Sequence, residues 1–454
     1  DLAYRTYLQV TLPEINQDDN AAGSVYARWL DCPGEQLISM VEVEIGGQRI
    51  DRQYGDFMHI WNQLTLCSEQ EDGYNKMIGN TTQLTFLTDP TFADVATACG
   101  AAAVPEAVCA PRNALPETTL YVPLQFWFCR NPGLALPLIA LQYHEVKINI
   151  EIRPMDECLF AVTQVGVSAA PGKNVKATAA YSKSLVAASL YVDYIFLDTD
   201  ERRRMAQNPH EYLIEQLQFT GDESIGSSSN KIKLNFNHPC KEIIWVVQPD
   251  DNVSYCDSFV ETKVLNMALG AQPFNYTDAI DALPNSIRAF SSSKQLNDGG
   301  AAGNTSVIST NGLFSDPNAG HSSAGENMAA TAVSELSGNL GSAGVTNGVS
   351  DAGAFVLAET SLKMHCWGEN PVVTAKLQLN GQDRFSEREG TYFDLVQPFQ
   401  HHTRTPDTGI NVYSFALRPE EHQPSGTCNF SRIDNATLQL VVSAAAIGSA
   451  NTAK

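Results

Sequence analysis

One short pattern occurs twice in this chain, far apart in the sequence. Residues 43–48 (Val-Glu-Ile-Gly-Gly-Gln) and residues 377–382 (Leu-Gln-Leu-Asn-Gly-Gln) both alternate apolar and polar side chains before a Gly-Gln pair. The two glycines, like the two glutamines, stand 334 positions apart. Alternation that ends in a tight turn is typical of a half-buried β-strand.

Each copy is followed by two further matched elements in the same order. Residues 124–132, which end in Arg-Asn-Pro, answer to residues 413–419, which end in Arg-Pro. The alternating segment 146–152 answers to residues 438–442. Three elements in one order, present twice, imply two copies of one β-domain.

Length and charge agree with a duplicated structural unit. The 454 residues suit two domains of roughly 200 residues, each large enough to bury its own core. Hydrophobic residues make up 43% and charged residues 18%, which is a globular composition. The net charge of −22 argues against direct nucleic-acid binding and predicts copies that repel unless a specific interface holds them.

The sequence shows no sign of a membrane-spanning segment, a leader segment or a disulfide framework. No apolar run approaches the ~20 residues of a membrane helix, and no signal peptide is visible. The chain starts at Asp1 without Met, so we expect a further segment before it in the full protein. None of the ten cysteines forms a Cys-x-x-Cys pair, which favours reduced, mostly buried thiols over a disulfide framework.

Period-two alternation dominates the rest of the chain. It predicts half-buried strands at residues 41–45, 146–152 and 231–236. Residues 243–247 are apolar on both faces, so we expect that strand to be covered on both sides. Strands separated by Gly, Pro and Asn with few helical patterns predict all-β sandwiches.

Two short helices and two long insertions complete the predicted organisation. We expect an amphipathic helix at residues 57–64 and a second helix at residues 198–207, capped by Asp198, that connects the domains. Residues 291–353 are rich in Gly, Ala, Ser and Asn and predict a surface insertion in the second domain. Residues 89–117 predict a similar, Ala-rich insertion in the first domain.

The search for chemistry yields no catalytic, cofactor or metal site. The phosphate-loop-like segment 166–174 has the wrong spacing and lacks the Ser or Thr that binds magnesium. His401 and His402 are adjacent, so on a strand they point to opposite faces and cannot share a metal ion. A glycosidase carboxylate pair stays open because acidic residues are abundant, although nothing singles one out.

Other motifs have both a functional and a structural interpretation. The charged run 200–204 is either a partner-binding patch or, as we prefer, a solvated linker helix. Trp127 with its two phenylalanine neighbours is either a sugar-binding platform or, as we prefer, core. Among six Asn-x-Ser/Thr sequons, Asn304 in the insertion is the best glycan candidate, followed by Asn275 and Asn80.

Four long segments carry a resemblance to a known family. They are residues 43–61 (VEIGGQRIDRQYGDFMHIW), 124–152 (with FWFCRNPGLALPLIALQYHEVKINIEI), 198–216 (DTDERRRMAQNPHEYLIEQ) and 377–436 (with NGQDRF and HHTRTPDTGINVYSFALRP). In these segments the chain strongly resembles major capsid proteins of nucleocytoplasmic large DNA viruses. The resemblance covers most of the chain except the two insertions.

The resemblance implies an all-β fold of two tandem eight-stranded jelly-roll sandwiches, a double jelly roll with long surface insertions and a few short helices. The domains would be residues 1–200 and 213–454, with a connector at 198–212. It also implies a homotrimer that forms a pseudo-hexagonal capsomer of an icosahedral shell, with no active site.

The family's partners and location follow from the same resemblance. The partners would be other copies of the chain, minor capsid and penton proteins, and an inner viral membrane that lies nearby without insertion. The shell would be assembled in the host cytoplasm. The chain departs from the family at both ends, where an N-terminal arm and a closing apolar strand are expected.

Three arginines that stand one or two residues before a proline are candidates for ordering the sandwich ends and the trimer contacts. They are Arg130, Arg404 and Arg418, and the alternative is that they anchor turns within the chain. Two other functions stay open at this stage. One is a carbohydrate-binding jelly-roll protein, which would carry exposed aromatics on a concave face. The other is a minor capsid paralogue of the same fold.

Overall fold

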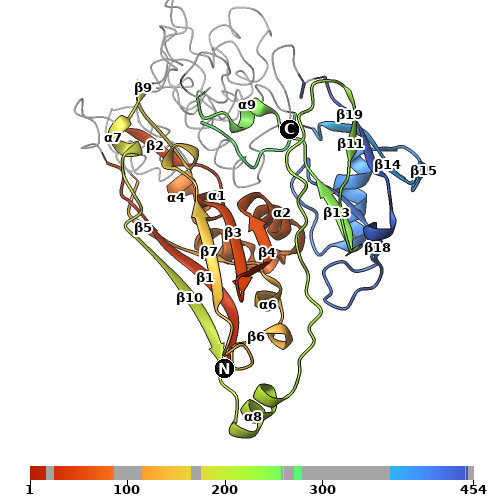
Figure 1. The fold of residues 1–454 in the computed structure, drawn as a ribbon. Helices are drawn as coiled ribbons and strands as arrows, with labels where there is room; N and C mark the ends of the chain where they lie inside the picture. Colours follow the sequence, from red (N-terminus) through yellow and green to blue (C-terminus); the bar gives the residue numbers. More distant parts are fainter. Residues whose placement is uncertain are drawn as a thin grey trace, which may run out of the picture.

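The computed structural model describes residues 1–16, 25–85, 115–164, 175–256, 259, 270–278, 369–444 and 446–447. Figure 1 shows two strand-rich bodies joined by one long connection. The predicted insertion 291–353, most of 89–117 and the loop 166–174 lie outside the described residues. No described helix combines the length and apolarity needed to cross a membrane.

The first body contains ten described strands in three antiparallel sheets. The sheet orders are β10-β1-β5 with β6 also on β1, then β2-β8-β9, and β4-β3-β7. The strands are β1 (Leu2–Leu12), β2 (Tyr26–Trp29), β3 (Ile38–Ile45), β4 (Gln48–Tyr54), β5 (Thr118–Pro123), β6 (Leu136–Pro137), β7 (Val146–Ile152), β8 (Leu159–Gln164), β9 (Val175–Lys176) and β10 (Ala187–Ile195). The helices are α1 (Pro33–Leu37), α2 (Gly55–Thr65), α3 (Ser68–Ile78), α4 (Thr82–Thr85), α6 (Trp127–Arg130), α7 (Thr178–Tyr181), η2 (Pro132–Leu134) and η3 (Met155–Glu157).

The second body contains nine described strands. Its sheet orders are β11-β19-β14-β15 with β16 also on β14, then β12-β18, and β13-β17. The strands are β11 (Ser229–Lys233), β12 (Pro239–Cys240), β13 (Glu242–Trp245), β14 (Val372–Leu379), β15 (Gln382–Asp383), β16 (Arg388–Glu389), β17 (Asn411–Ser414), β18 (Cys428–Asn429) and β19 (Ala436–Val442). The helices are α9 (Asp250–Val253), the π-helix η5 (Tyr392–Val396), α17 (Gln397–His401) and η6 (Phe430–Arg432).

The repeated Gly-Gln pattern forms the same hairpin in both bodies. Ile45 pairs with Gln48 across the first turn, and Leu379 pairs with Gln382 across the second. Both turn residues have positive φ in each copy: 62° and 81° at residues 46 and 47, and 51° and 80° at residues 380 and 381. Two left-handed residues in succession define the type I′ turn, which Gly and Asn tolerate best.

Strand pairing extends the repeat beyond the hairpins. β3 pairs with β7 as β14 pairs with β19, which confirms the predicted match of these strands. In the first body both β5 and β6 pair with β1. In the second body the corresponding strands β17 and β18 pair with β13 and β12. β1 therefore corresponds to β12 and β13 together, and the two bodies are copies of one fold.

The predicted match at residues 124–132 differs in its local structure. β5 ends at Pro123, and residues 127–130 form the short helix α6 instead of continuing a strand. Phe126, Trp127 and Phe128 are all buried, and the two phenylalanine rings stack with centroids 5.6 Å apart. Successive residues of a strand point to opposite faces, so a strand with one side in water would expose at least one of these three side chains. They are core, as predicted.

Each body has its own hydrophobic core, and a third cluster joins them. The first core gathers around Trp29, Phe126 and Phe128, and the second gathers around Phe393 and Phe430. In the third cluster, residues 60 and 64 of α2 pack with Ile410 and Val412 and with the outer side chains of residues 244 and 246. The strand 243–247 is therefore covered on both faces, as predicted, because residue 243 lies in the second core.

The predicted connector helix is α8 (Thr199–Gln207). Asp198 precedes it, but the carbonyl of this residue, and not its side chain, accepts a hydrogen bond from the Arg202 amide. The Arg202 guanidinium pairs with the Asp1 carboxylate at 2.8 Å, so the helix is tied to the start of β1. From α8 the chain runs extended along the molecule to β11 (Figure 1).

Candidate functional site

A helical segment follows the hairpin in both bodies, at equivalent positions. In the first body it is α2, which begins at Gly55, and in the second it runs from Gly390 through η5 and α17. A Cβ on Gly55 would lie within 3.0 Å of the carbonyl oxygen of Ile38, the first residue of β3. A Cβ on Gly390 would meet the carbonyl oxygen of Val372, the first residue of β14, in the same way. The second helical segment was not predicted from the sequence.

The two helical segments share a burial pattern only at their starts. Residues 55–59 and 390–394 are buried, exposed, half-buried, buried and buried, in that order, in both copies. The patterns then diverge. Ile60 and Leu64 are buried, whereas the side chains at the corresponding positions, Leu395 and Phe399, are 50% and 82% exposed. The same helix face is thus covered in the first body and open in the second.

The surface that covers Ile60 and Leu64 belongs to the second body. This surface consists of the outward-facing side chains of the β13-β17 sheet. In that sheet Ile244 of β13 lies opposite Val412 of β17. The equivalent sheet of the first body pairs β1 with β5, and there Gln9 pairs with Tyr121. Gln9 donates a hydrogen bond to the Tyr121 hydroxyl at 3.2 Å, so the equivalent surface is polar and lies open in a single chain.

Arg130, a predicted anchor, lies between the two bodies. Its guanidinium carbon stands 4.2 Å from the centroid of the Trp61 ring, over the ring face. Its Nη1 is 3.2 Å from a carboxylate oxygen of Glu215, which also pairs with Lys241. Burial lowers the pKa of Arg130, and the charge of Glu215 opposes this shift. The side chain joins α2 of the first body to the connection that leads into the second.

The other two predicted anchors lie in different surroundings. Arg404 donates its backbone N–H to the Leu64 carbonyl at 3.1 Å, and its guanidinium pairs with Glu71 of α3 at 3.0 Å, so it also bridges the two bodies. Arg418 is exposed and pairs with Glu421 at 2.9 Å within its own loop. A role of these arginines in contacts between copies stays a prediction.

The expectation that the adjacent histidines lie on a strand is wrong, because His401 is the last residue of helix α17 and His402 follows it. His401 contacts the carbonyl of Leu417, whereas His402 is completely buried between two carboxylates. Its Nδ1 lies 3.0 Å from Glu420 and its Nε2 lies 2.8 Å from Glu242. Burial alone would lower the pKa of His402, but the two hydrogen-bonded carboxylates outweigh it and raise the pKa to about 9.

Two of the three candidate glycan sites are described. The Asn275 side-chain nitrogen donates to Gln272 at 2.9 Å, and its oxygen accepts from the Thr277 hydroxyl at 2.7 Å. The Asn80 side-chain oxygen accepts the Cys32 amide at 3.4 Å. Asn304 lies outside the described residues. Glycosylation at the three sites stays a prediction.

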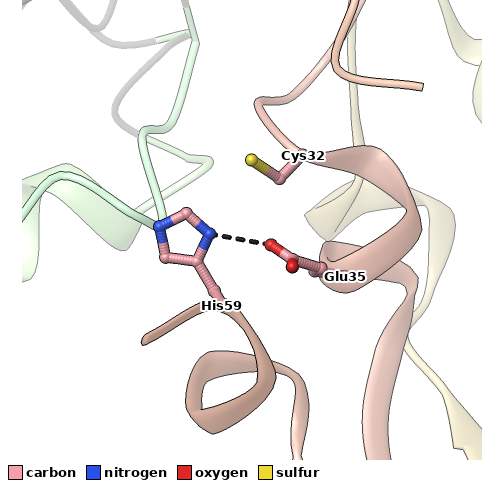
Figure 2. Close-up of side chains that lie close together, drawn as sticks. All are labelled: Cys32, Glu35 and His59. Carbon is pink, nitrogen blue, oxygen red and sulfur yellow. Dashed lines mark hydrogen bonds and ion pairs between the residues drawn. The ribbon is translucent and has the colours of Figure 1, made fainter. Parts of the chain in front are cut away.

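The structure also brings together three buried side chains of metal-ligand type that the sequence analysis did not single out. The side chains of Cys32, Glu35 and His59 meet in the interior of the first body, with ligand-type atoms all within 4.8 Å of one another (Figure 2). Cys32 precedes α1, Glu35 lies in it, and His59 comes from α2. The His59 Nδ1 stands 2.7 Å from a Glu35 oxygen.

Fold and surface together define the class of the protein. Two copies of a jelly-roll sandwich lie side by side, and the apolar face of one repeated helix is buried between them while the other stays open. This is a double jelly-roll protein whose second helical segment, as described, presents exposed apolar side chains.

Comparisons with known proteins identify the family within this class. A family model described as "Large eukaryotic DNA virus major capsid protein" matches residues 201–454, and a model described as "Major capsid protein N-terminus" matches residues 1–198. The chain belongs to the family of major capsid proteins of large eukaryotic DNA viruses, and its function is structural, in the virion capsid.

Individual relatives agree with this assignment. The major capsid protein of Phaeocystis pouchetii virus is 71% identical over 456 residues, covering 100% of this chain and 83% of the relative. That of Chrysochromulina ericina virus is 66% identical, covering 100% and 85%. A quasi-atomic model of the PBCV-1 virus capsid is 30% identical with a TM-score of 0.56, covering 100% of this chain and 86% of that one. The Faustovirus major capsid protein, at 12% identity and a TM-score of 0.59, shares the fold, with coverage of 100% and 84%.

Proposed function

We propose that the chain forms a homotrimer with a pseudo-hexagonal outline, in which six jelly rolls form a ring. The supporting observation is the open face of the second helical segment. In a ring of six similar domains, each contact between neighbours repeats. The face with Ile60 and Leu64 docks on the second domain within one chain. Leu395 and Phe399 would dock in the same way on the first domain of a neighbouring copy.

The docking surface for this contact would be the outer face of the β1-β5 sheet. It corresponds to the sheet that covers α2 within one chain, and it carries Gln9, Thr11, Thr119 and Tyr121. The contact within the chain is apolar, whereas this surface is polar and its Thr11 and Thr119 hydroxyls lie 3.1 Å apart. A surface that stands in water before assembly is expected to be more polar than a permanently buried one.

A further apolar edge lies on the same sheet. β10 is its outer strand, and Leu190, Tyr191 and Tyr194 on it are exposed, as is Phe196 just after it. An exposed edge strand with large apolar side chains is prone to pair with another chain unless a partner covers it. We assign β10 to contacts between copies in the ring or between neighbouring rings.

The remaining assignments rest on the family. We propose domain limits of 1–200 and 213–454 with a connector at 198–212, minor capsid and penton proteins as further partners, and assembly in the host cytoplasm. An inner viral membrane would lie nearby without being entered. The net charge of −22 supports a shell that does not touch the genome directly.

The test is the solution mass of the purified chain by light scattering on a sizing column. We expect a species of three times 49.3 kDa that persists on dilution. Phe399→Asp should shift it to monomer, because each interface then loses the roughly 2 kcal/mol of a buried phenylalanine and gains a buried charge. Thr119→Arg on the opposing surface should act in the same direction.

Tyr143→Asp is the matched control, because Tyr143 is 89% exposed and lies on neither surface. It should leave the trimer intact. A wild-type chain that stays monomeric, or a Phe399→Asp variant that stays trimeric, would reject the proposed contact.

A further inference from the structure

The buried group of Cys32, Glu35 and His59 has the composition of a metal site. Within the described residues it is a set of three different ligand types, thiol, carboxylate and imidazole, all less than a tenth exposed. Figure 2 shows the Cys32 sulfur, a Glu35 oxygen and the His59 Nδ1 turned toward one common space. A cation 2.0–2.3 Å from each ligand atom fits such spacing, and this ligand set is typical of Zn²⁺.

Two residues of the first body hold the carboxylate in place. The second oxygen of Glu35 accepts hydrogen bonds from the Asn62 amide at 2.8 Å and from the Tyr74 hydroxyl at 2.5 Å. These two hydrogen bonds orient the Glu35 carboxylate, as the outer partners of a metal ligand do.

The imidazole is fixed from the side of the second body. The Phe274 ring stacks on the His59 ring, with centroids 4.1 Å apart and planes 18° from parallel.

The backbone at Cys32 has φ 50°, a left-handed conformation that is unfavourable for a residue other than Gly, Asn or Asp. The chain thus adopts an unfavourable backbone conformation at Cys32, whose thiol is directed toward Glu35 and His59.

An independent observation comes from Tyr276, a buried neighbour in the cluster between the bodies. Its hydroxyl is fully enclosed and has no hydrogen-bond partner in the described part of the chain. Tyr276 packs in one cluster with Ile60, the residue after His59, and Phe274, two residues before Tyr276, stacks on the His59 ring, so Tyr276 lies close to the group in the fold. An unpartnered buried hydroxyl is unfavourable, and a water molecule on a bound cation would give it a partner.

We propose that Cys32, Glu35 and His59 bind one divalent transition-metal cation, with Zn²⁺ as the preferred ion, at the junction of the two jelly rolls. Binding displaces the Cys32 thiol proton and the proton shared by Glu35 and His59, and both protons go to solvent. The cation ties α1 to α2 beneath Phe274 and Tyr276, and so stabilises the contact between the bodies. At the position of the second body that corresponds to His59, the chain has Asp394 instead of an imidazole.

The test is a cobalt titration of the full chain after removal of metal with a chelator. We expect one Co²⁺ per chain, with the near-ultraviolet thiolate-to-cobalt charge-transfer band and the visible bands of a tetrahedral site, all abolished by one equivalent of Zn²⁺. Zn²⁺ should also raise the melting temperature of the stripped protein by several degrees, because the cation binds only the folded state.

Two cysteine variants distinguish this site from binding elsewhere. Cys32→Ala should lose the charge-transfer band, whereas Cys129→Ala, which removes another buried thiol of the first body, should keep it. A wild-type chain without a stoichiometric band, or a Cys32→Ala chain that retains the band, would overturn the proposal. If Cys32→Ala fails to fold, as judged by circular dichroism, the wild-type titration decides alone.

Discussion

Gly390 packs its α-carbon directly against the carbonyl oxygen of Val372, and no side chain fits between them. Gly55 stands in the same relation to Ile38, which lies 334 positions before Val372. In both jelly rolls the helix after the hairpin therefore starts where the backbone of the first strand crosses beneath it. This close approach is a property of the repeated fold, because two different sequences arrive at it.

Gly390→Ala is expected to destabilise the chain. The new methyl group would lie far inside contact distance of a backbone oxygen, and overpacking of this kind costs about 1 to 3 kcal/mol. Urea unfolding followed by circular dichroism measures the change. Gly73→Ala is the control, because Gly73 lies exposed in α3 with no atom near its Cβ position. That variant should gain roughly 0.5 to 1 kcal/mol, and equal effects of the two variants would contradict the packing argument.

The duplicated fold was predictable from the sequence because its hairpins are local. A type I′ turn needs two left-handed residues, so Gly46-Gly47 and Asn380-Gly381 mark it directly. The helix from Gly390 was not predictable in this way, because Pro398 and several aromatic residues conceal its period. Its equivalence with α2 rests on the contact with Val372, which only the folded chain brings about.

Replacing Arg130 should weaken the link between the two bodies. Arg130→Met removes both the cation over Trp61 and one partner of Glu215, which retains Lys241. We expect a loss of about 2 kcal/mol in the free energy of unfolding, less than for a buried carboxylate left alone. Arg130→Lys should recover only part of it, because the planar guanidinium is what stacks on the ring.

Arg418→Met is the control for the arginine experiment. Arg418 is exposed and pairs only within its own loop, so its loss should change stability by less than about 0.5 kcal/mol. Denaturant unfolding of all three variants gives the comparison. An Arg130→Met variant as stable as Arg418→Met would show that Arg130 does not brace the junction.

The sequence indicated two arginines that lie at the junction of the two bodies, but not their partners. Prolines two residues further along drew attention to Arg130 and Arg404, yet Glu215 and Glu71 lie 85 and 333 residues away from them. The group at Cys32 escaped notice for the same reason, because His59 comes from a different helix and follows no metal-binding spacing. Contacts across domains depend on docking, which local patterns do not encode.

Mild oxidation is expected to join Cys240 and Cys428. They are directly opposite on β12 and β18, and opposed residues of an antiparallel pair have Cα atoms about 4.5 to 5.5 Å apart, which a disulfide can span. Burial and the neighbouring Cys428 raise the pKa of Cys240 to about 11, so the thiolate is scarce at neutral pH and the reaction should accelerate as pH rises. Peptide mapping after treatment with diamide identifies the bridge. A map that shows these two cysteines still as thiols would disprove the prediction.

His402 should make stability depend on pH in the alkaline range. Its pKa of about 9 in the folded chain exceeds the ordinary value of 6.5, so the fold binds the proton more tightly than the unfolded chain does. The resulting stabilisation is complete below about pH 6.5 and is lost as pH rises through about 9. A shift of this size corresponds to about 3 kcal/mol.

The measurement is the difference in unfolding free energy between the wild-type chain and His402→Gln across this range. Glutamine keeps a donor for Glu242 or Glu420 but cannot carry the charge that both carboxylates face. The wild-type advantage should therefore be largest below about pH 6.5, shrink as pH rises from there to about 9, and level off above it, where both the folded and the unfolded chain have lost the imidazole proton. His401→Gln, at a half-buried neighbour without a carboxylate partner among its described contacts, should give no such slope. A difference between wild type and His402→Gln that stays constant across this range would mean that His402 is held by packing and not by its charge.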